Sequence, residues 1–320
     1  MQHFNPTRRR VLGLLAAAGL ALSSLSATAL AAGSDTLNIG YQKYGTLVLL
    51  KAQGTLEKRL APLGVKVKWA EFPGGPQLLE ALNVGSVDLG TTGETPPIFA
   101  QAAGADLLYL ANEPAAPEGE AIVVGKDSPI RSVKDLKGKR VALNKGSNVH
   151  YLLVRALEKA GLKYEDITPV FLNPADGRAA FQQGSVDAWV IWDPFLAAAE
   201  KQLNARQLAD GKSIVNNTQF YLARKPYVAS NPKVIKVVLE ELQRLDAWGK
   251  NNIPEVAAEL SGQIGLDKDI VQVAAKRSGY GVKLLDGKVV AEQQRIADTF
   301  FKLKLIPKPL VVKDIVWDGK

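Results

Sequence analysis

The stretch Gly184-Ser185-Val186-Asp187-Ala188-Trp189-Val190-Ile191 decides the fold, because its first four residues have already occurred once as Gly85-Ser86-Val87-Asp88. The two copies lie 99 residues apart, and each joins a predicted helix to a short apolar strand. One tetrapeptide recurs easily by chance, but the same tetrapeptide in the same context indicates a duplicated supersecondary unit.

Outward from these turns, each half of the chain follows the order strand, helix, strand, helix. In the first half the pattern predicts strands at 37–41 and 65–70 and helices at 46–60 and 77–84. The second half predicts the same order, with strands at 140–144 and 168–172 and helices at 148–160 and 174–183. Strands that alternate with helices predict an α/β fold with open, mostly parallel sheets flanked by helices.

The duplication predicts two lobes with a cleft between them. Lobe one comprises residues 35–118 and 222–320, and lobe two comprises residues 119–221. The Pro-rich stretch Glu113–Gly119 is predicted to be one of the segments that cross from one lobe to the other. The strands at 121–124 and 220–223 are expected at the hinge between the lobes. Four predicted helices at 232–248, 254–264, 267–276 and 289–303 are expected to pack back onto lobe one.

The first 31 residues read as a signal peptide. Arg8, Arg9 and Arg10 precede a short apolar run, and Ala29-Leu30-Ala31 is a cleavage motif. The run from 11 to 22 is shorter than a membrane span requires. Both a twin-arginine-like and a general secretory route fit. Cleavage would lower the formal net charge from +8 to +5, and we expect a periplasmic protein.

The composition excludes several classes of function. The 320 residues are 47% hydrophobic and 22% charged, which is typical of a globular protein, and they include no cysteine. Thiolate metal sites, disulfides and a lipid-anchored N-terminal cysteine are therefore absent. His150 is the only histidine of the predicted mature chain, and nothing completes a triad with Ser147. We expect a non-enzymatic protein with no metal, no cofactor and no nucleic-acid partner.

Three turns between strands and helices are suited to an anion, because each pairs a glycine with hydroxyl or amide groups at a helix N-terminus. An equally simple interpretation of each single turn is an ordinary helix cap. The candidate residues are Gln42, Lys43, Gly45 and Thr46 in the first turn, Gly93, Glu94 and Thr95 in the second, and Gly146, Ser147 and Asn148 in the third. No phosphate-binding glycine fingerprint is present, so a nucleotide ligand is not expected.

Aromatic residues offer a wall for the rest of a ligand. Trp192 and Asp193 follow the predicted strand at 188–191, where the cleft is expected. Trp189 lies inside the same strand and is expected in the core. A position in the wall of the cleft also fits the sequence.

The chain resembles the periplasmic solute-binding proteins of ABC transporters, in the nitrate, sulfonate and taurine group. The resemblance is strongest to aliphatic sulfonate-binding proteins. It rests on 39–47 (IGYQKYGTL), 93–97 (GETPP), Lys145-Gly146-Ser147-Asn148 with His150, and 173–194 (NPADGRAAFQQGSVDAWVIWDP). It implies a two-lobed, type II-like periplasmic-binding-protein fold. It also implies oxyanion contacts from Gln42, Gly45, Thr46, Gly93, Glu94, Ser147, Asn148 and His150, with Trp192 and Asp193 at the cleft.

The resemblance implies a monomeric receptor that captures an alkanesulfonate and passes it to a permease in the inner membrane for sulfur acquisition. Nitrate, taurine or sulfate esters as ligands, or a thiamine-pyrimidine-related protein of the same fold, remain alternatives. Glu94 beside an anion is expected either to accept hydrogen bonds or to position Lys43.

Overall fold

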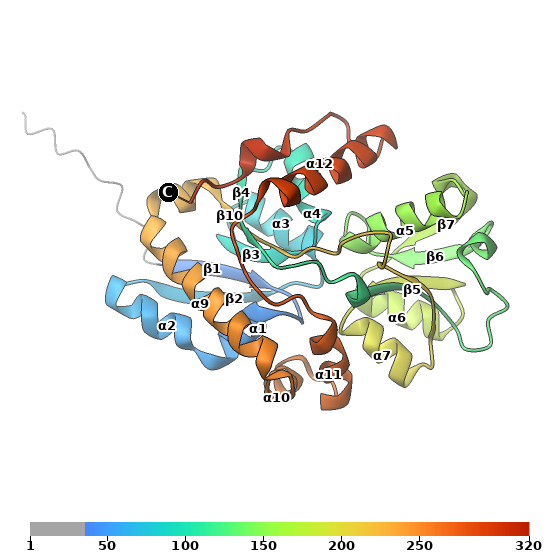
Figure 1. Ribbon diagram of the computed structural model, residues 1–320, viewed down its shortest axis with the longest axis horizontal. Coiled ribbons are helices and arrows are strands. Elements are labelled where there is room, and N and C mark those ends of the chain that lie inside the picture. The colour runs from blue at the N-terminus through green and yellow to red at the C-terminus, as the bar shows by residue number, and fades with distance from the viewer. Residues whose placement is uncertain (1–35, 320) are drawn as a thin grey trace, which may run out of the picture. The chain divides into compact units, whose positions relative to one another are not determined.

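The computed structural model describes residues 36–319, and the predicted signal peptide at 1–31 lies outside these residues. Within the described part, the strands form two sheets of five strands each (Figure 1). The first sheet has the order β2-β1-β3-β10-β4, built from Thr36–Tyr41 (β1), Lys66–Glu71 (β2), Leu89–Thr92 (β3), Leu107–Asn112 (β4) and Phe220–Arg224 (β10). The second has the order β7-β6-β8-β5-β9, built from Glu120–Val124 (β5), Arg140–Leu143 (β6), Thr168–Phe171 (β7), Ala188–Trp192 (β8) and Arg206–Asp210 (β9).

The two sheets share one plan. In the first, β1 pairs in parallel with β2 and β3, while β10 runs antiparallel between β3 and β4. In the second, β6 pairs in parallel with β7 and β8, while β5 runs antiparallel between β8 and β9. The predicted α/β class with mostly parallel sheets is confirmed. The antiparallel strand of each sheet, β5 or β10, follows directly on a segment that joins the two sheets.

The aspartate of the repeated tetrapeptide forms the same hydrogen bonds in both sheets. The Asp88 carboxylate accepts the backbone N–H of Asn38 at the start of β1, at 3.0 Å, and the Asp187 carboxylate accepts that of Arg140 at the start of β6, at 2.8 Å. In return, the backbone N–H of each aspartate donates to the carbonyl of the same partner, at 2.8 Å in both cases. The duplicated turn therefore holds the third strand of each unit against the first.

Helices cover the sheets. They are Thr46–Gln53 (α1), Thr55–Leu60 (α2), Gly75–Asn83 (α3), Pro96–Ala102 (α4), Asn148–Lys159 (α5), Pro174–Gln182 (α6), Phe195–Gln202 (α7), Lys225–Ser230 (α8), Pro232–Asn251 (α9), Ile253–Ile264 (α10), Lys268–Arg277 (α11) and Gly287–Lys302 (α12). The single helix predicted at 46–60 is wrong. Gly54 adopts φ +60°, a left-handed conformation that ends α1 and begins α2. Within the described residues, no helix is long and apolar enough to cross a membrane.

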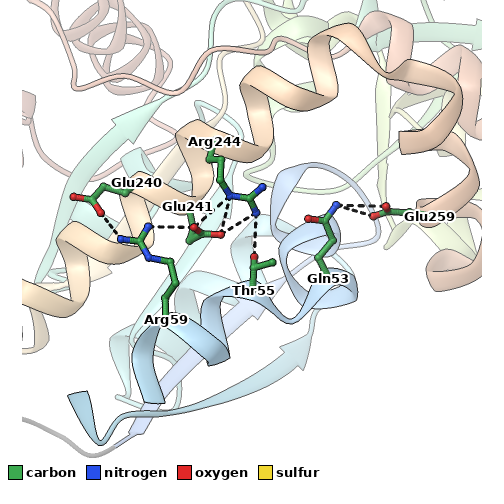
Figure 2. Close-up of polar contacts among 7 residues, drawn as sticks. All are labelled: Gln53, Thr55, Arg59, Glu240, Glu241, Arg244 and Glu259. Atoms are coloured by element: carbon green, nitrogen blue, oxygen red, sulfur yellow. Dashed lines mark hydrogen bonds and ion pairs between the residues drawn. The ribbon is translucent and has the colours of Figure 1, made fainter. Parts of the chain in front are cut away.

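The C-terminal helices pack against the N-terminal ones, with α9 and α10 beside α1 and α2 (Figure 1). Figure 2 shows the polar part of this contact: Arg59 of α2 bonds Glu240 and Glu241 of α9, and Arg244 joins Glu241 to Thr55. Burial alone would raise the pKa of Glu241, but hydrogen bonds from Arg244, Thr55 and Arg59 outweigh it and lower that pKa to about 2. The carboxylate therefore stays charged and bridges the two helices at neutral pH.

Candidate ligand-binding site

A pocket lies between elements of the two sheets and opens to solvent. Its polar lining comes from three helix starts, from the segments that join the sheets and from the C-terminal end of α11. These lining residues are Lys43, Tyr44, Gly45, Thr46, Glu113, Asn148, Asp193, Asn217, Gln219, Arg277 and Ser278. Its apolar lining comes mainly from α1, α10 and α11, and from Trp192.

Three helices begin at this pocket. Gly45 and Thr46 lie at the start of α1, Asn148 is the first residue of α5, and Pro194 precedes α7. The first N–H groups of a helix have no acceptor within the helix, and the helix dipole adds partial positive charge there. Gly45 adopts φ +77°, and a Cβ there would meet no atom within 4 Å, so its backbone lies open. The arrangement suits an oxyanion held mainly by uncharged donors.

Arg277 adds a full positive charge. It is the last residue of α11, and its guanidinium bonds Glu200 of α7 at 2.9 Å and Asp193 at 3.5 Å. Burial raises the pKa of Asp193 to about 6, although the charge of Arg277 acts in the opposite direction. Arg277 thus links the C-terminal helices to the second sheet and reduces the negative field of Asp193 at the pocket.

The remaining carboxyl group of the lining favours its uncharged form. Burial, followed by the charge of Asp246, raises the pKa of Glu113 well above its usual range. Tyr221 donates its hydroxyl hydrogen bond to Glu113, while Thr46 donates to Asp246. With Glu113 protonated, the charged groups that remain favour an anion.

A chain of side-chain hydrogen bonds crosses from the first sheet to the second. Tyr44 donates to Gln219 at 2.9 Å, and the Gln219 amide donates to Asn217 at 3.3 Å. From the other side, the Asn148 amide donates to Asn217 at 3.1 Å and also to Glu120. The polar groups at this contact are therefore held in place by one another before a ligand arrives.

Six of the thirteen candidate residues line this pocket: Lys43, Gly45, Thr46, Asn148, Trp192 and Asp193. Lys43 is half exposed and lies 3.6 Å from the Glu71 carboxylate. Trp192 is 6% exposed at the end of β8. Trp189 is buried inside the same strand.

Three of the other candidates do not line the pocket but contact residues of the surrounding structure. The Gln42 amide donates to the Thr91 carbonyl at 3.0 Å and to the Tyr44 hydroxyl at 3.2 Å. Gly93 faces Asn148, because a Cβ on Gly93 would lie 2.8 Å from the Asn148 Cβ. Gly146 adopts φ +75°, and a Cβ there would lie 3.6 Å from the Phe99 ring. Gly93 therefore allows close approach between elements of the two sheets, whereas glycine at 146 is favoured by its positive φ.

Glu94 is buried outside this pocket and lines a second one with Asn112, Lys283 and Gln293. Its carboxylate accepts the Thr218 backbone N–H at 2.9 Å. Lys43 pairs instead with Glu71. Of the two roles expected for Glu94, the structure shows the hydrogen-bond acceptor.

Ser147, His150 and Thr95 are buried away from the pocket. The Ser147 hydroxyl donates to the Asn144 carbonyl at 2.7 Å. His150 accepts the Gly146 N–H at 3.2 Å and lies against Phe99 of α4 and Phe300 of α12. Burial, followed by the charge of Lys145, lowers the pKa of His150 to about 4, so its imidazole is neutral at pH 7.

The family model described as NMT1/THI5 like matches residues 61–249. The chain belongs to the NMT1/THI5-like family. A protein of Escherichia coli (strain K12) named as an aliphatic sulfonates-binding protein is 47% identical over 305 residues, which are 95% of each chain.

Two solved structures of this NMT1/THI5-like group are similar over most of the chain. The alkanesulfonate-binding protein SsuA from Xanthomonas axonopodis pv. citri, bound to MOPS, has a TM-score of 0.86 and 43% identity, covering 90% of this chain and 99% of its own. The periplasmic aliphatic sulphonate binding protein SsuA from Escherichia coli has a TM-score of 0.81 and 46% identity, with 90% and 94% coverage. The resemblance to aliphatic sulfonate-binding proteins is confirmed, as is the prediction that the chain is not an enzyme.

Sequence patterns alone missed several lining residues of this family member. Asn217 and Gln219 lie in the segment that returns to the first sheet, and Arg277 precedes Ser278-Gly279-Tyr280-Gly281. That last stretch also combines glycine, a hydroxyl group and an aromatic ring, but it follows the C-terminus of α11 and lacks the helix N-terminus that marks the three predicted turns.

Replacing Glu94 by glutamine is expected to change how stability depends on pH. Burial raises the pKa of Glu94 from 4.5 to about 7. Its stabilising contribution is therefore complete below pH 4.5 and is lost as pH rises through 7, because the unfolded chain releases the proton first. Glutamine does not titrate, and its side-chain oxygen can still accept the Thr218 N–H. The free energy of unfolding of Glu94→Gln, relative to the natural protein, should rise by about 3 kcal/mol between pH 4.5 and 8.

Urea unfolding at several pH values measures this difference. The control is Glu165→Gln, since Glu165 is exposed, and its difference from the natural protein should stay nearly constant over the same range. Parallel pH profiles for Glu94→Gln and the natural protein would contradict the prediction.

Proposed function

We propose that the chain captures alkanesulfonates in the pocket between the two sheets and delivers them to an ABC importer in the inner membrane. The observation that carries this proposal is the mixed lining of one pocket, in which polar groups and apolar side chains occur together. Helix starts, Asn148 and Arg277 supply the polar groups, whereas α1, α10 and α11 supply most of the apolar side chains. An alkanesulfonate presents both kinds of surface, because it joins three charged oxygens to an alkyl chain.

Relatives support this ligand class. The structurally similar protein from Xanthomonas axonopodis pv. citri is an alkanesulfonate-binding protein bound to MOPS, and the one from Escherichia coli is a periplasmic aliphatic sulphonate binding protein. By analogy, this chain works in the periplasm after export. Its two sheets form two lobes, bounded near residues 118 and 221. Closure of these lobes over the ligand is the change that a permease recognises.

A panel of small anions tests the proposal by calorimetry at equal ionic strength. Ethanesulfonate is expected to bind in the micromolar range, because it can contact both the polar and the apolar lining residues. Nitrate and sulfate are expected to bind at least tenfold more weakly, since neither has an apolar part to bury. Tighter binding of nitrate, sulfate or a pyrimidine than of any alkanesulfonate would overturn the proposal.

Two neighbouring substitutions locate the site in the same assay. Asn148→Ala removes an amide that lines the pocket and is expected to weaken ethanesulfonate binding about tenfold. Ser147→Ala is the matched control, because its hydroxyl donates to the Asn144 carbonyl outside the pocket. Equal losses in the two variants would place the ligand elsewhere.

A further inference from the structure

Four aromatic side chains pack together outside the ligand pocket, and the function proposed above does not assign them a role. Phe99 lies on α4 and Phe300 on α12, while His150 and Tyr151 are neighbours on α5. None of the four lines the pocket. We refer to these four residues as the interlobe aromatic cluster.

The helices that carry the cluster belong to different lobes. The helix α4 connects β3 to β4 of the first sheet, and Gln293 of α12 donates to the Tyr109 hydroxyl of β4 at 2.8 Å. The helix α5 instead connects β6 to β7 of the second sheet. Figure 1 shows α12 and α4 on the side from which α5 approaches the first lobe. Contacts of α4 and α12 with α5 therefore cross from one lobe to the other.

Ring packing makes this contact. The centroid of the His150 ring lies 6.3 Å from that of Phe99, with the two planes only 24° apart, and 5.5 Å from that of Phe300. The Tyr151 ring lies 5.9 Å from Phe300. Within the first lobe, Phe99 and Phe300 meet edge to face at 5.0 Å, so they support each other. Such ring pairs stabilise a contact by more than the burial of their area.

Hydrogen bonds inside the second lobe fix the His150 ring for this packing. Its Nδ1 accepts the Gly146 N–H at 3.2 Å, so the proton of the neutral ring is on Nε2, which lies 2.9 Å from the Tyr164 hydroxyl. Both nitrogens are thus satisfied within one lobe. The faces of the ring remain available to Phe99 and Phe300 of the other lobe.

The cluster bears on ligand binding because α5 also carries a pocket residue. Asn148 lines the pocket and precedes His150 by two positions. Lys43 and Gly45 reach the same pocket from the first lobe. The pocket is therefore complete only while the lobes keep this arrangement. When fewer molecules have the arrangement that binds, the apparent dissociation constant rises in proportion.

We propose that the interlobe aromatic cluster holds the two lobes together in the ligand-free protein and thereby raises the affinity without touching the ligand. The effect on affinity rests on the proposed function, because it assumes that a sulfonate occupies the pocket. The effect on the lobes does not, since it concerns the protein without ligand. Phe99 isolates this contact best, because its side chain is only partly buried and its ring packs on α5.

Small-angle X-ray scattering and calorimetry of Phe99→Ala test the cluster. Without ligand, the variant is expected to have a larger radius of gyration than the natural protein, and saturating ethanesulfonate should restore the natural value. Its affinity for ethanesulfonate should fall about tenfold, since the ligand must then bring the lobes together without the ring contact.

Phe181→Ala is the matched control. The Phe181 ring packs on Trp189 at 5.9 Å, and both residues belong to the second lobe, on α6 and β8. The same loss of a ring should lower the melting temperature there but leave the radius of gyration and the affinity unchanged. Equal losses of affinity in Phe99→Ala and Phe181→Ala would overturn the inference, because they would indicate a general loss of stability.

A second variant covers the case in which Phe99→Ala does not fold. Phe300→Leu keeps a large apolar side chain but removes the ring pairs with His150 and Tyr151, so it should change both measurements in the same direction and to a smaller extent. Natural radius and affinity in the folded variants would overturn the inference while leaving the proposed function standing. If the natural protein bound no alkanesulfonate, the proposed function would fail, and the scattering comparison would still decide whether the cluster holds the lobes together.

Discussion

Replacing Arg277 by alanine is expected to lower the affinity for ethanesulfonate at least 100-fold. The substitution removes a cation from the lining of the pocket and leaves Asp193 and Glu200 without their shared partner. The Asp193 side chain is 10% exposed, so its charge is poorly screened by water. Removing the protein cation from a desolvated charge pair with a bound anion typically costs about 3 kcal/mol of binding free energy, which is a factor of more than 100 in affinity.

The loss in Arg277→Ala should depend on pH. Burial raises the pKa of Asp193 to about 6 against the opposing charge of Arg277, so removing Arg277 should raise that pKa further. Protonation of Asp193 removes a negative charge beside the ligand. The affinity of the variant is therefore expected to recover partly as pH falls from 8 to 5, and this recovery should begin at a higher pH than in the natural protein, where Asp193 protonates near pH 6.

Calorimetry over this pH range gives both results. The control is Arg140→Ala, which removes a half-exposed arginine paired with Asp187 outside the pocket. It should leave the affinity unchanged. Arg277→Lys keeps the charge without the planar pair of donors and should restore part of the binding. An affinity of Arg277→Ala within threefold of the natural value would exclude Arg277 from the site.

Replacing Gly93 by alanine is expected to lower the affinity about 30-fold. Gly93 follows β3 of the first sheet, and the added Cβ would lie 2.8 Å from the Asn148 Cβ and 2.9 Å from its Cγ. Asn148 is held by hydrogen bonds to Glu120 and Asn217, so it cannot move aside freely. Overpacking of this kind costs about 2 kcal/mol, and here it opposes approach of the two sheets around the ligand.

Calorimetry and a thermal melt separate this effect from misfolding. Gly262→Ala adds the same methyl group on α10, where a Cβ would meet no atom within 4 Å. It should leave affinity unchanged. Gly93→Ala should weaken binding while keeping a cooperative melting transition, since each sheet retains its own core. Natural affinity in Gly93→Ala would show that the contact between Gly93 and Asn148 does not limit binding.

Local sequence patterns predicted much of the fold because most elements are bounded by strong local signals. The strand at 37–41 and the helix at 148–160 match β1 and α5 closely. The strand β9, Arg206–Asp210, was missed because it is a half-buried edge strand with no apolar run. The helix predicted at 46–60 failed at Gly54, where the apolar period continues although the backbone turns.

The candidate site was predicted less completely than the fold. Lys43, Gly45, Thr46, Asn148, Trp192 and Asp193 line the pocket, and each lies at a turn that local patterns mark. Ser147 and His150 belong to one of the same turns, but their side chains point to other partners. A turn pattern locates a backbone segment, and the direction of each side chain depends on what packs against it.

The sequence alone determined the duplicated α/β plan, since alternation, helix period and turn residues are local properties of the chain. The tertiary structure alone decided which side chains share the pocket. Gln219, Arg277 and the apolar lining residues of α10 and α11 come from segments far from the predicted turns and reach the pocket only when the chain returns to the first sheet. Their positions depend on packing between distant elements, and no local pattern of residues encodes that.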